Sequence, residues 1–176
     1  MIRTNFRGGE GGGFNYPDTY KMIVDLLPDN ANIVEVGVWD GESTICMAEL
    51  IRDSGKRVKF YAVDSFKPFM IDGVKHQADY EIYFFNTEHV RNYIHTIICD
   101  SQMCAKFFDR SLDFVFIDAD HEYLSVKADI AAWLPKIKAG GILAGHDYDM
   151  EGVKKAVDEV FDNIEQFKNT VWLKRL

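Results

Sequence analysis

Five short and almost uninterrupted apolar runs constrain the fold of this chain more than any other feature. Such runs are typical of strands buried on both faces of a parallel sheet. Helix-like patterns separate them, and strands that alternate with helices predict a doubly wound α/β sheet with right-handed crossovers. The predicted strands are 32–38, 58–64, 94–100, 112–118 and 140–147, and the predicted helices are 16–27, 42–52, 123–134 and 151–161.

The remaining segments indicate the domain organisation. A chain of 176 residues is large enough for one domain with its own core. We expect a flexible, Gly-rich N-terminus over 1–15, one domain over 16–176, and two strands within 163–176 joined by a tight turn around Asn169. Residues 65–93 are long for a crossover and dense in aromatic residues, so they form either a lid over a site or a helix packed on the sheet.

Charge and composition narrow the function classes. The net charge of −8 repels phosphate backbones and anionic membranes, which counts against nucleic acid as a partner. No stretch approaches the roughly 20 apolar residues of a membrane span, and the first residues lack the apolar core of a secretory signal. The three cysteines lack metal-ligand spacing and indicate reduced thiols. We therefore expect a cytoplasmic protein that neither binds nucleic acid nor enters a membrane.

The ends of the predicted strands carry the first functional signal. Asp64, Asp100 and Asp118 each close a strand, and His146 and Asp147 close the fifth. The carboxyl ends of parallel strands lie at one edge of the sheet, which is where open α/β sheets bind ligands. One acid at a strand end is ordinary capping, but several at one edge predict a binding site.

The stretch VEVGVWDGEST (34–44) predicts a strand, a glycine turn and a helix start. Gly37 and Gly41 permit a tight turn and close backbone approach. The helix opening around Ser43 offers free N–H groups to a ligand carboxylate or phosphate. A dinucleotide fingerprint needs a second glycine where this chain has Trp39, so a pyrophosphate ligand is disfavoured.

Two of the strand-end acids fit a nucleoside. Asp64 lies at the distance along the chain expected for a carboxylate that binds a ribose diol. Asp100, followed by Ser101, is placed to accept a hydrogen bond from an adenine amino group. For each acid alone a strand cap is the competing explanation, but together with the glycine turn the two acids favour a nucleoside-containing ligand.

Several segments of the chain resemble a known family. VEVGVWDGEST, FYAVDSF, IICDS, FIDADHEYLSVKADIAAWLPKIKAGGILAGHDY and GVKKAVDEVF resemble the class I S-adenosylmethionine-dependent methyltransferases. More narrowly, the chain is similar to the methyltransferase family 24 type, relatives of macrolide-sugar and catechol O-methyltransferases. The resemblance spans roughly residues 31–174, and Phe116–Tyr148 is its most specific part.

This resemblance implies a Rossmann-like sheet of seven strands, mostly parallel with an antiparallel last strand, and helices on both faces. It also implies that the methyl donor lies across the strand ends. Glu35, Gly37 and Gly41 would border its methionine part, Asp64 its ribose and Asp100 its adenine. The rest of the expected donor site is Trp39, Ser43, Ser65, Ser101 and Asp118.

The resemblance further implies candidates for the chemistry. In metal-dependent relatives, one acid after the fourth strand and two residues after the fifth bind a divalent cation, which places Mg²⁺ or Mn²⁺ at Asp118, His146 and Asp147. His146 departs from that pattern, where an acid or amide is usual. Asp120 matches the general base of sugar-modifying relatives, and His121 competes because its ordinary pKa lies near neutrality.

We therefore expect an S-adenosylmethionine-dependent methyltransferase that methylates a hydroxyl group of a small molecule, with divalent-metal assistance as an option. Two alternatives stay open: an NAD(P)-dependent oxidoreductase on a similar fold, and a catalytically inactive nucleoside-binding module. Short relatives often pair, so a homodimer is an option for the assembly.

Overall fold

The computed structural model describes residues 13–71, 74–109, 111–168 and 170–176. The expectations for the glycine patch before residue 13 and for the turn at Asn169 therefore lie outside the described residues. The helices are α1 (Pro17–Leu26), α2 (Glu42–Ser54), α3 (Tyr80–Thr87), η1 (Glu88–Tyr93), α4 (Ser101–Ala105), α5 (Tyr123–Trp133), η2 (Leu134–Lys136) and α6 (Glu151–Asp158). The strands are β1 (Ala31–Val36), β2 (Val58–Asp64), β3 (Phe69–Ile71), β4 (Val74–His76), β5 (His95–Ile98), β6 (Leu112–Ile117), β7 (Ile137–Gly145), β8 (Glu165–Phe167) and β9 (Val171–Arg175).

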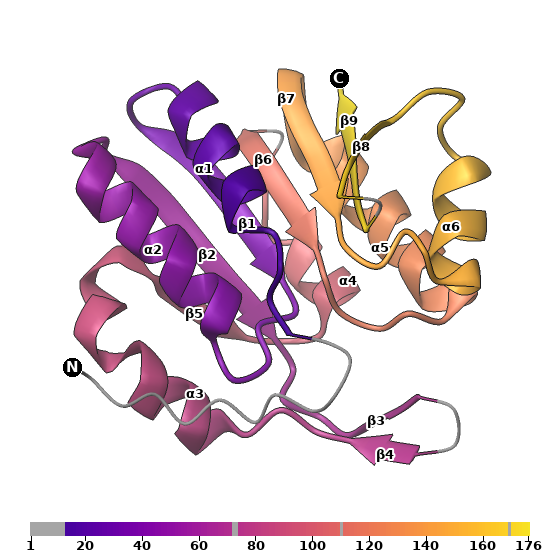
Figure 1. The fold of residues 1–176 in the computed structure, drawn as a ribbon, viewed down its shortest axis with the longest axis horizontal. Coiled ribbons are helices and arrows are strands. Elements are labelled where there is room, and N and C mark those ends of the chain that lie inside the picture. Colours follow the sequence, from indigo (N-terminus) through magenta and orange to yellow (C-terminus); the bar gives the residue numbers. More distant parts are fainter. Residues whose placement is uncertain (1–12, 72–73, 110, 169) are drawn as a thin grey trace.

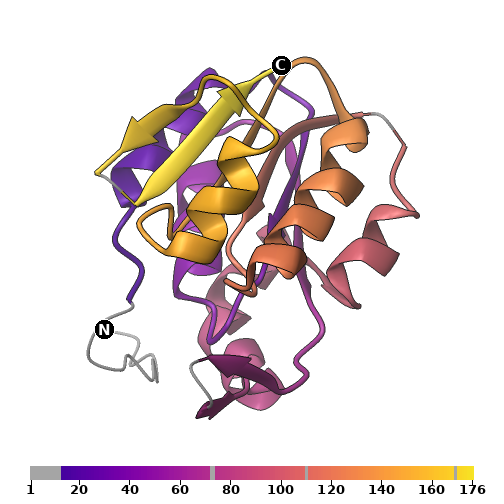
Figure 2. The ribbon, with the colours of Figure 1, turned by 90° about the vertical axis from the view of Figure 1, so that its right-hand side faces the viewer.

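In the part of the chain that is described, seven strands form one sheet in the order β5-β2-β1-β6-β7-β9-β8. The five strands from β5 to β7 are parallel, and β9 runs antiparallel to both of its neighbours. This arrangement confirms the predicted mostly parallel sheet with an antiparallel last strand. β3 and β4 form a separate two-stranded hairpin, which extends past the carboxyl ends of the strands (Figures 1 and 2).

Helices cover both faces of the sheet, and the alternation of side chains along each strand decides which face they meet. In β6, Phe114 and Phe116 pack in the cluster that includes α1 and α2. Their neighbours Val115 and Ile117 pack with α4, α5 and α6 instead. Figure 1 shows α1 and α2 in front of the sheet, and Figure 2 shows α4, α5 and α6 on the other side. Burial on both faces explains the continuous apolar runs.

Two regions differ from the predicted elements. β7 begins at Ile137 rather than at residue 140, because its pairing with β6 shifts register between Leu112 and Phe114. The segment 65–93 folds as the β3–β4 hairpin followed by α3 and η1. Tyr83 of α3 is fully buried against the sheet, whereas other rings of the same helix are exposed. The crossover-helix alternative is therefore right for part of this segment.

None of the helices in the described ranges is long and apolar enough to cross a membrane.

Candidate active site

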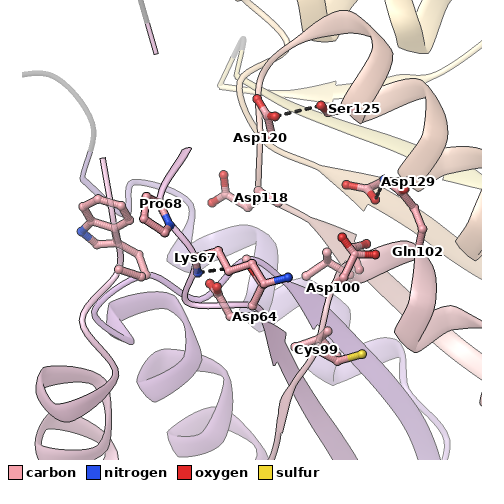
Figure 3. A pocket seen from close by; sticks show the side chains of 18 residues that line it. Asp64, Lys67, Pro68, Cys99, Asp100, Gln102, Asp118, Asp120, Ser125 and Asp129 are labelled. Carbon is pink, nitrogen blue, oxygen red and sulfur yellow. Dashed lines mark hydrogen bonds between the residues drawn. The ribbon is translucent and has the colours of Figure 1, made fainter. Parts of the chain in front are cut away.

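The carboxyl ends of β1, β2, β5 and β6 surround a cavity of about 240 Å³. Asp64, Asp100 and Asp118, which follow or end three different strands, all line it (Figure 3). The prediction that these three carboxylates meet at one edge of the sheet is confirmed. The other predicted site residues that line the cavity are Gly37, Trp39, Ser65, Ser101 and Asp120.

Asp64 holds together the loops that follow β1 and β2, both of which border the cavity. One carboxylate oxygen accepts a hydrogen bond from the backbone N–H of Val38 at 2.9 Å, and the other accepts from that of Phe66 at 2.7 Å. Each carboxylate oxygen has a second lone pair. Asp64 therefore joins the β1 and β2 loops and keeps acceptor capacity for a ligand hydroxyl.

Asp100 and Ser101 lie where β5 passes into α4. The Asp100 carboxylate caps this short helix by accepting from the backbone N–H of Met103 at 3.0 Å. The hydroxyl oxygen of Ser101 accepts a hydrogen bond from the indole N–H of Trp133 at 2.9 Å. Asp100 is thus a strand-end cap and a cavity residue at the same time.

Gly37 is required by backbone packing as well as by the cavity. Its φ of +85° lies in the left-handed region, and a Cβ at this position would be 2.0 Å from the backbone oxygen of Asp118. The β1 turn therefore lies directly against the residue that follows β6. Trp39 in the same turn also has a positive φ, of 47°, and is 38% exposed beside the cavity.

Three predicted donor-site residues lie outside the cavity lining. Glu35 faces α1 and α2, where its carboxylate accepts from the Tyr20 hydroxyl at 2.8 Å and from the Thr44 hydroxyl at 2.5 Å. Gly41 packs against α3 and Ser43 is buried. Burial raises the pKa of Glu35 to about 7, although these hydroxyl groups lower it. These residues support the wall from behind rather than line it.

Asp118 and Asp120 both face the cavity, but their partners differ. The Tyr16 hydroxyl donates to Asp118 at 2.6 Å from a position 102 residues away in the sequence. Asp120 accepts from the backbone N–H of Glu122 at 3.0 Å and from the Ser125 hydroxyl at 2.8 Å, both at the start of α5.

Behind these acids lies a histidine layer, formed by His121, His146 and Asp147. Asp147 lies 2.9 Å from Nε2 of His121 and 3.1 Å from Nδ1 of His146. Burial lowers the pKa of both histidines, but nearby carboxylates outweigh it and raise that of His146 to about 10. In the opposite sense, the two histidines outweigh burial and hold the pKa of Asp147 well below its usual value.

A group of potential metal-ligand atoms at this edge of the sheet fits a divalent cation. Asp118, His121 and Asp147 each offer one ligand atom, and these atoms lie within 4.8 Å of one another. Two carboxylates and one imidazole suit Mg²⁺ or Mn²⁺ with other oxygen ligands completing the shell. This group contains His121, whereas the resemblance pointed to His146, whose Nδ1 lies 3.7 Å from Asp118.

Several residues that line the cavity are not predicted from the sequence, among them Asp129, Gln102 and Lys67. An acid within the helix predicted over 123–134 is expected on its solvent-exposed face. This expectation is wrong for Asp129, because only 3% of the residue is exposed and it lines the cavity. A signal was present, since Asp129 lies three residues after Val126 on the buried face of α5. Gln102 and Lys67, which also line the cavity, follow strand-end residues without a distinctive pattern.

The part of the chain that contains the cavity residues is similar to known proteins. A family model described as a methyltransferase domain (Methyltransf_24) matches residues 34–148, which is more than half of the chain. The chain is also similar to the uncharacterized protein y4gI of Sinorhizobium fredii, with 28% identity over 128 residues. That match covers 67% of this chain and 13% of y4gI, so the chain spans only a small part of this relative.

Solved structures share the fold. SMU.1697c from Streptococcus mutans, in complex with SAH, matches with a TM-score of 0.63 at 13% identity, over 92% of this chain and 98% of that one. The O-methyltransferase NovP matches with a TM-score of 0.62 at 20% identity, over 90% and 78% of the two chains. CalS11, a TDP-rhamnose 3′-O-methyltransferase of calicheamicin biosynthesis, matches with a TM-score of 0.62 at 18% identity, over 90% and 76%.

Proposed function

Because the chain belongs to the methyltransferase-domain family, we propose that it transfers the methyl group of S-adenosylmethionine to a hydroxyl group of a small molecule. The observation that carries this proposal is the single cavity in which Asp64, Asp100 and Asp118 meet. Open α/β sheets bind their ligands at this edge.

The donor is proposed to lie across the ends of β1, β2 and β5. Asp64 accepts the ribose hydroxyls with its remaining lone pairs, next to Ser65. Asp100 and Ser101 border the adenine. Trp39 forms the wall next to the methionine part or the acceptor, because its side chain lines the cavity beside Gly37.

The charge of the cavity supports a cationic donor and an acceptor without phosphate groups. A sulfonium is attracted by nearby carboxylates, whereas a phosphate is repelled. Together with the net charge of −8, this supports a small-molecule acceptor over nucleic acid. The charged side chains among the described lining residues are those of Asp64, Asp100, Asp118, Asp120, Asp129 and Lys67.

Methyl transfer is an in-line displacement in which the acceptor oxygen bonds to the methyl carbon as the bond from that carbon to sulfur breaks. A hydroxyl group must lose its proton to a base to become a good nucleophile. Asp120 lines the cavity, whereas Nδ1 of His121 is buried and has no hydrogen-bond partner among the described residues. This placement favours Asp120 as the base that takes the proton.

The proposal also includes a divalent cation that assists the reaction. Asp118, His121 and Asp147 would hold it, and when bound it would lower the pKa of the acceptor hydroxyl. The pairing of His121 and His146 with Asp147 competes with the cation for the same carboxylate. We therefore expect metal affinity to rise as these histidines lose their protons.

Isothermal titration calorimetry tests the donor site. We expect S-adenosylmethionine and its demethylated product S-adenosylhomocysteine to bind, and Asp64→Ala to weaken both by roughly tenfold or more. Asp162→Asn, which removes an exposed carboxylate, is the matched control. NADH should not bind, because Trp39 stands where a pyrophosphate would need a glycine. Absence of donor binding at millimolar ligand would overturn the proposal.

Turnover separates an enzyme from a binding module. Donor consumption should be measured across a panel of phenols and sugars, with Mg²⁺ and with a chelator. Donor binding without methylation of any acceptor would favour the inactive module. Activity that a chelator leaves unchanged, with no ion bound after soaking in Mg²⁺ or Mn²⁺, would remove the cation from the proposal.

A further inference from the structure

Asp129 is a buried carboxylate that the proposed reaction does not use. It projects from α5 into the wall of the cavity beside Asp100 (Figure 3) and is 3% exposed. Burial raises the pKa of its carboxyl, and hydrogen bonds from Ser101 and Gln102 oppose that rise. A buried carboxylate without a role is costly, so its partners indicate what it does.

Those partners are two side chains of α4. The side-chain amide nitrogen of Gln102 donates a hydrogen bond to the Asp129 carboxylate at 3.1 Å. The hydroxyl oxygen of Ser101 accepts from the indole N–H of Trp133, which is also on α5, at 2.9 Å. The buried face of α5 therefore holds both cavity-lining residues at the start of α4 in a defined orientation.

The contact with Asp129 decides which end of the Gln102 amide is available to a ligand. A carboxylate only accepts hydrogen bonds, so it binds the NH₂ end of the amide and leaves the carbonyl oxygen, Oε1. Among the described residues, nothing donates a hydrogen bond to this Oε1. A cavity wall that presents a carbonyl oxygen prefers a ligand group that carries N–H.

We propose that Asp129 is a positioning residue that holds Gln102 with its carbonyl oxygen toward the cavity, so that the site selects a base bearing an exocyclic amino group over one bearing a carbonyl there. This inference rests on the proposed function, because it assigns the base to the donor's adenosyl group. In an inosyl analogue a carbonyl oxygen replaces the amine. This oxygen and Oε1 of Gln102 are both hydrogen-bond acceptors, so they would repel each other and form no hydrogen bond. Without Asp129 the amide is free to rotate and offer its NH₂ group to that oxygen.

The test compares S-adenosylhomocysteine with S-inosylhomocysteine by isothermal titration calorimetry, using the full chain. The wild type should bind the adenosyl ligand more tightly by roughly tenfold or more. Asp129→Ala should narrow this ratio about fivefold, and Asp129→Asn, which keeps an oxygen acceptor, should stay near the wild-type ratio. Glu122→Gln removes an exposed carboxylate beside the same helix and should leave the ratio unchanged.

Each outcome is decisive. An unchanged ratio in Asp129→Ala overturns the inference, as does a wild type that binds both ligands equally, and both results leave the proposed function intact. A wild type that binds neither ligand overturns the proposed function and this inference together. If Asp129→Ala does not fold, Gln102→Ala replaces it as the test. Gln102 is half-buried, and its removal should also narrow the ratio of the two affinities. A merely structural role for Asp129 would weaken both ligands equally and leave the ratio unchanged.

Discussion

The acids at the ends of β2 and β5, toward the lateral edge of the sheet, and those of β1 and β6, at its centre, are held in different ways. At the edge, Asp64 and Asp100 accept from backbone N–H groups two or three residues further on, and Asp64 also binds Val38 of the adjoining loop. At the centre, Glu35 accepts from the hydroxyl of Tyr20 in α1 at 2.8 Å, and Asp118 accepts from the hydroxyl of Tyr16, the residue before α1, at 2.6 Å. Backbone amides do not titrate or change rotamer, whereas the central acids depend on the docking of a helix.

This difference indicates that the two groups of acids have separate roles, which is the division that the predictions below test. The edge is built by local structure and suits a ligand of constant shape, such as a nucleoside. The centre joins α1, the β6 loop and the histidine layer through side chains, so its geometry responds to charge. Four predictions test this contrast, from the largest expected effect to the smallest.

Gly37→Ala should damage both regions at once, because the β1 turn touches the backbone of Asp118. The added Cβ would lie 2.0 Å from that backbone oxygen at a φ of +85°. We expect a loss of free energy of unfolding on the order of 3 kcal/mol in urea denaturation.

Gly55→Ala is the matched control for this change. Its φ is also positive, at 67°, but nothing lies within 4 Å of the added Cβ, so it should cost only about 1 kcal/mol. Equal losses in the two variants would show that the turn, and not the contact with Asp118, limits this position.

Glu35 should make the centre sensitive to pH. Its pKa is about 7 in the folded chain, against an ordinary value of 4.5. The folded state therefore retains the proton longer, and the stabilisation is complete below about pH 4.5, falls as the pH rises, and is lost above about 7. Urea denaturation at pH 5 and pH 8 should show a loss on the order of 2 kcal/mol in the wild type that Glu35→Gln lacks. Parallel pH profiles of the two proteins would contradict this.

Tyr16→Phe should weaken the centre and spare the edge. It removes the hydroxyl that donates to Asp118 and leaves the ring in the core. We expect a loss of about 1.5 kcal/mol in unfolding free energy with little change in the affinity for S-adenosylhomocysteine. Tyr80→Phe at an exposed ring is the control. A large loss of donor affinity in Tyr16→Phe would break the proposed division.

Asp100→Ala should have the smallest effect on stability and a clear effect on the ligand. Loss of the α4 cap should cost about 1 kcal/mol, and Asp100→Asn, which still caps, should cost less. Calorimetry should show weaker donor binding in the alanine variant. Unchanged donor affinity there would leave Asp100 with a structural role alone.

The same contrast explains what the sequence could predict. The parallel strands and the acids that follow them are local patterns, so the sequence alone predicts that Asp64, Asp100 and Asp118 are neighbours. The contact between Tyr16 and Asp118 joins positions 102 residues apart, and no local pattern encodes it. The charge of Asp129 predicts an exposed position, whereas its helical register places it on the buried face of α5 with Val126. The prediction from charge is the wrong one.

The short elements of the 65–93 segment were also beyond sequence patterns. β3 and β4 have three residues each, too few for periodicity to distinguish a strand from a loop. The cap of α3 was visible in principle, because the Asp79 carboxylate accepts from the N–H groups of Glu81 and Ile82. The aromatic residues around α3 are compatible with both a lid over the site and a helix packed on the sheet.

The reversal of β9 has a practical consequence for handling this protein. β9 runs back along β7, and the carbonyl of Leu176 accepts from the N–H of Gly140 near the amino end of that strand. A tag or surface tether attached after Leu176 would leave from the end opposite the cavity (Figure 1). Asn15, by contrast, contacts His146 of the histidine layer. Immobilisation for binding assays should therefore use the carboxyl terminus.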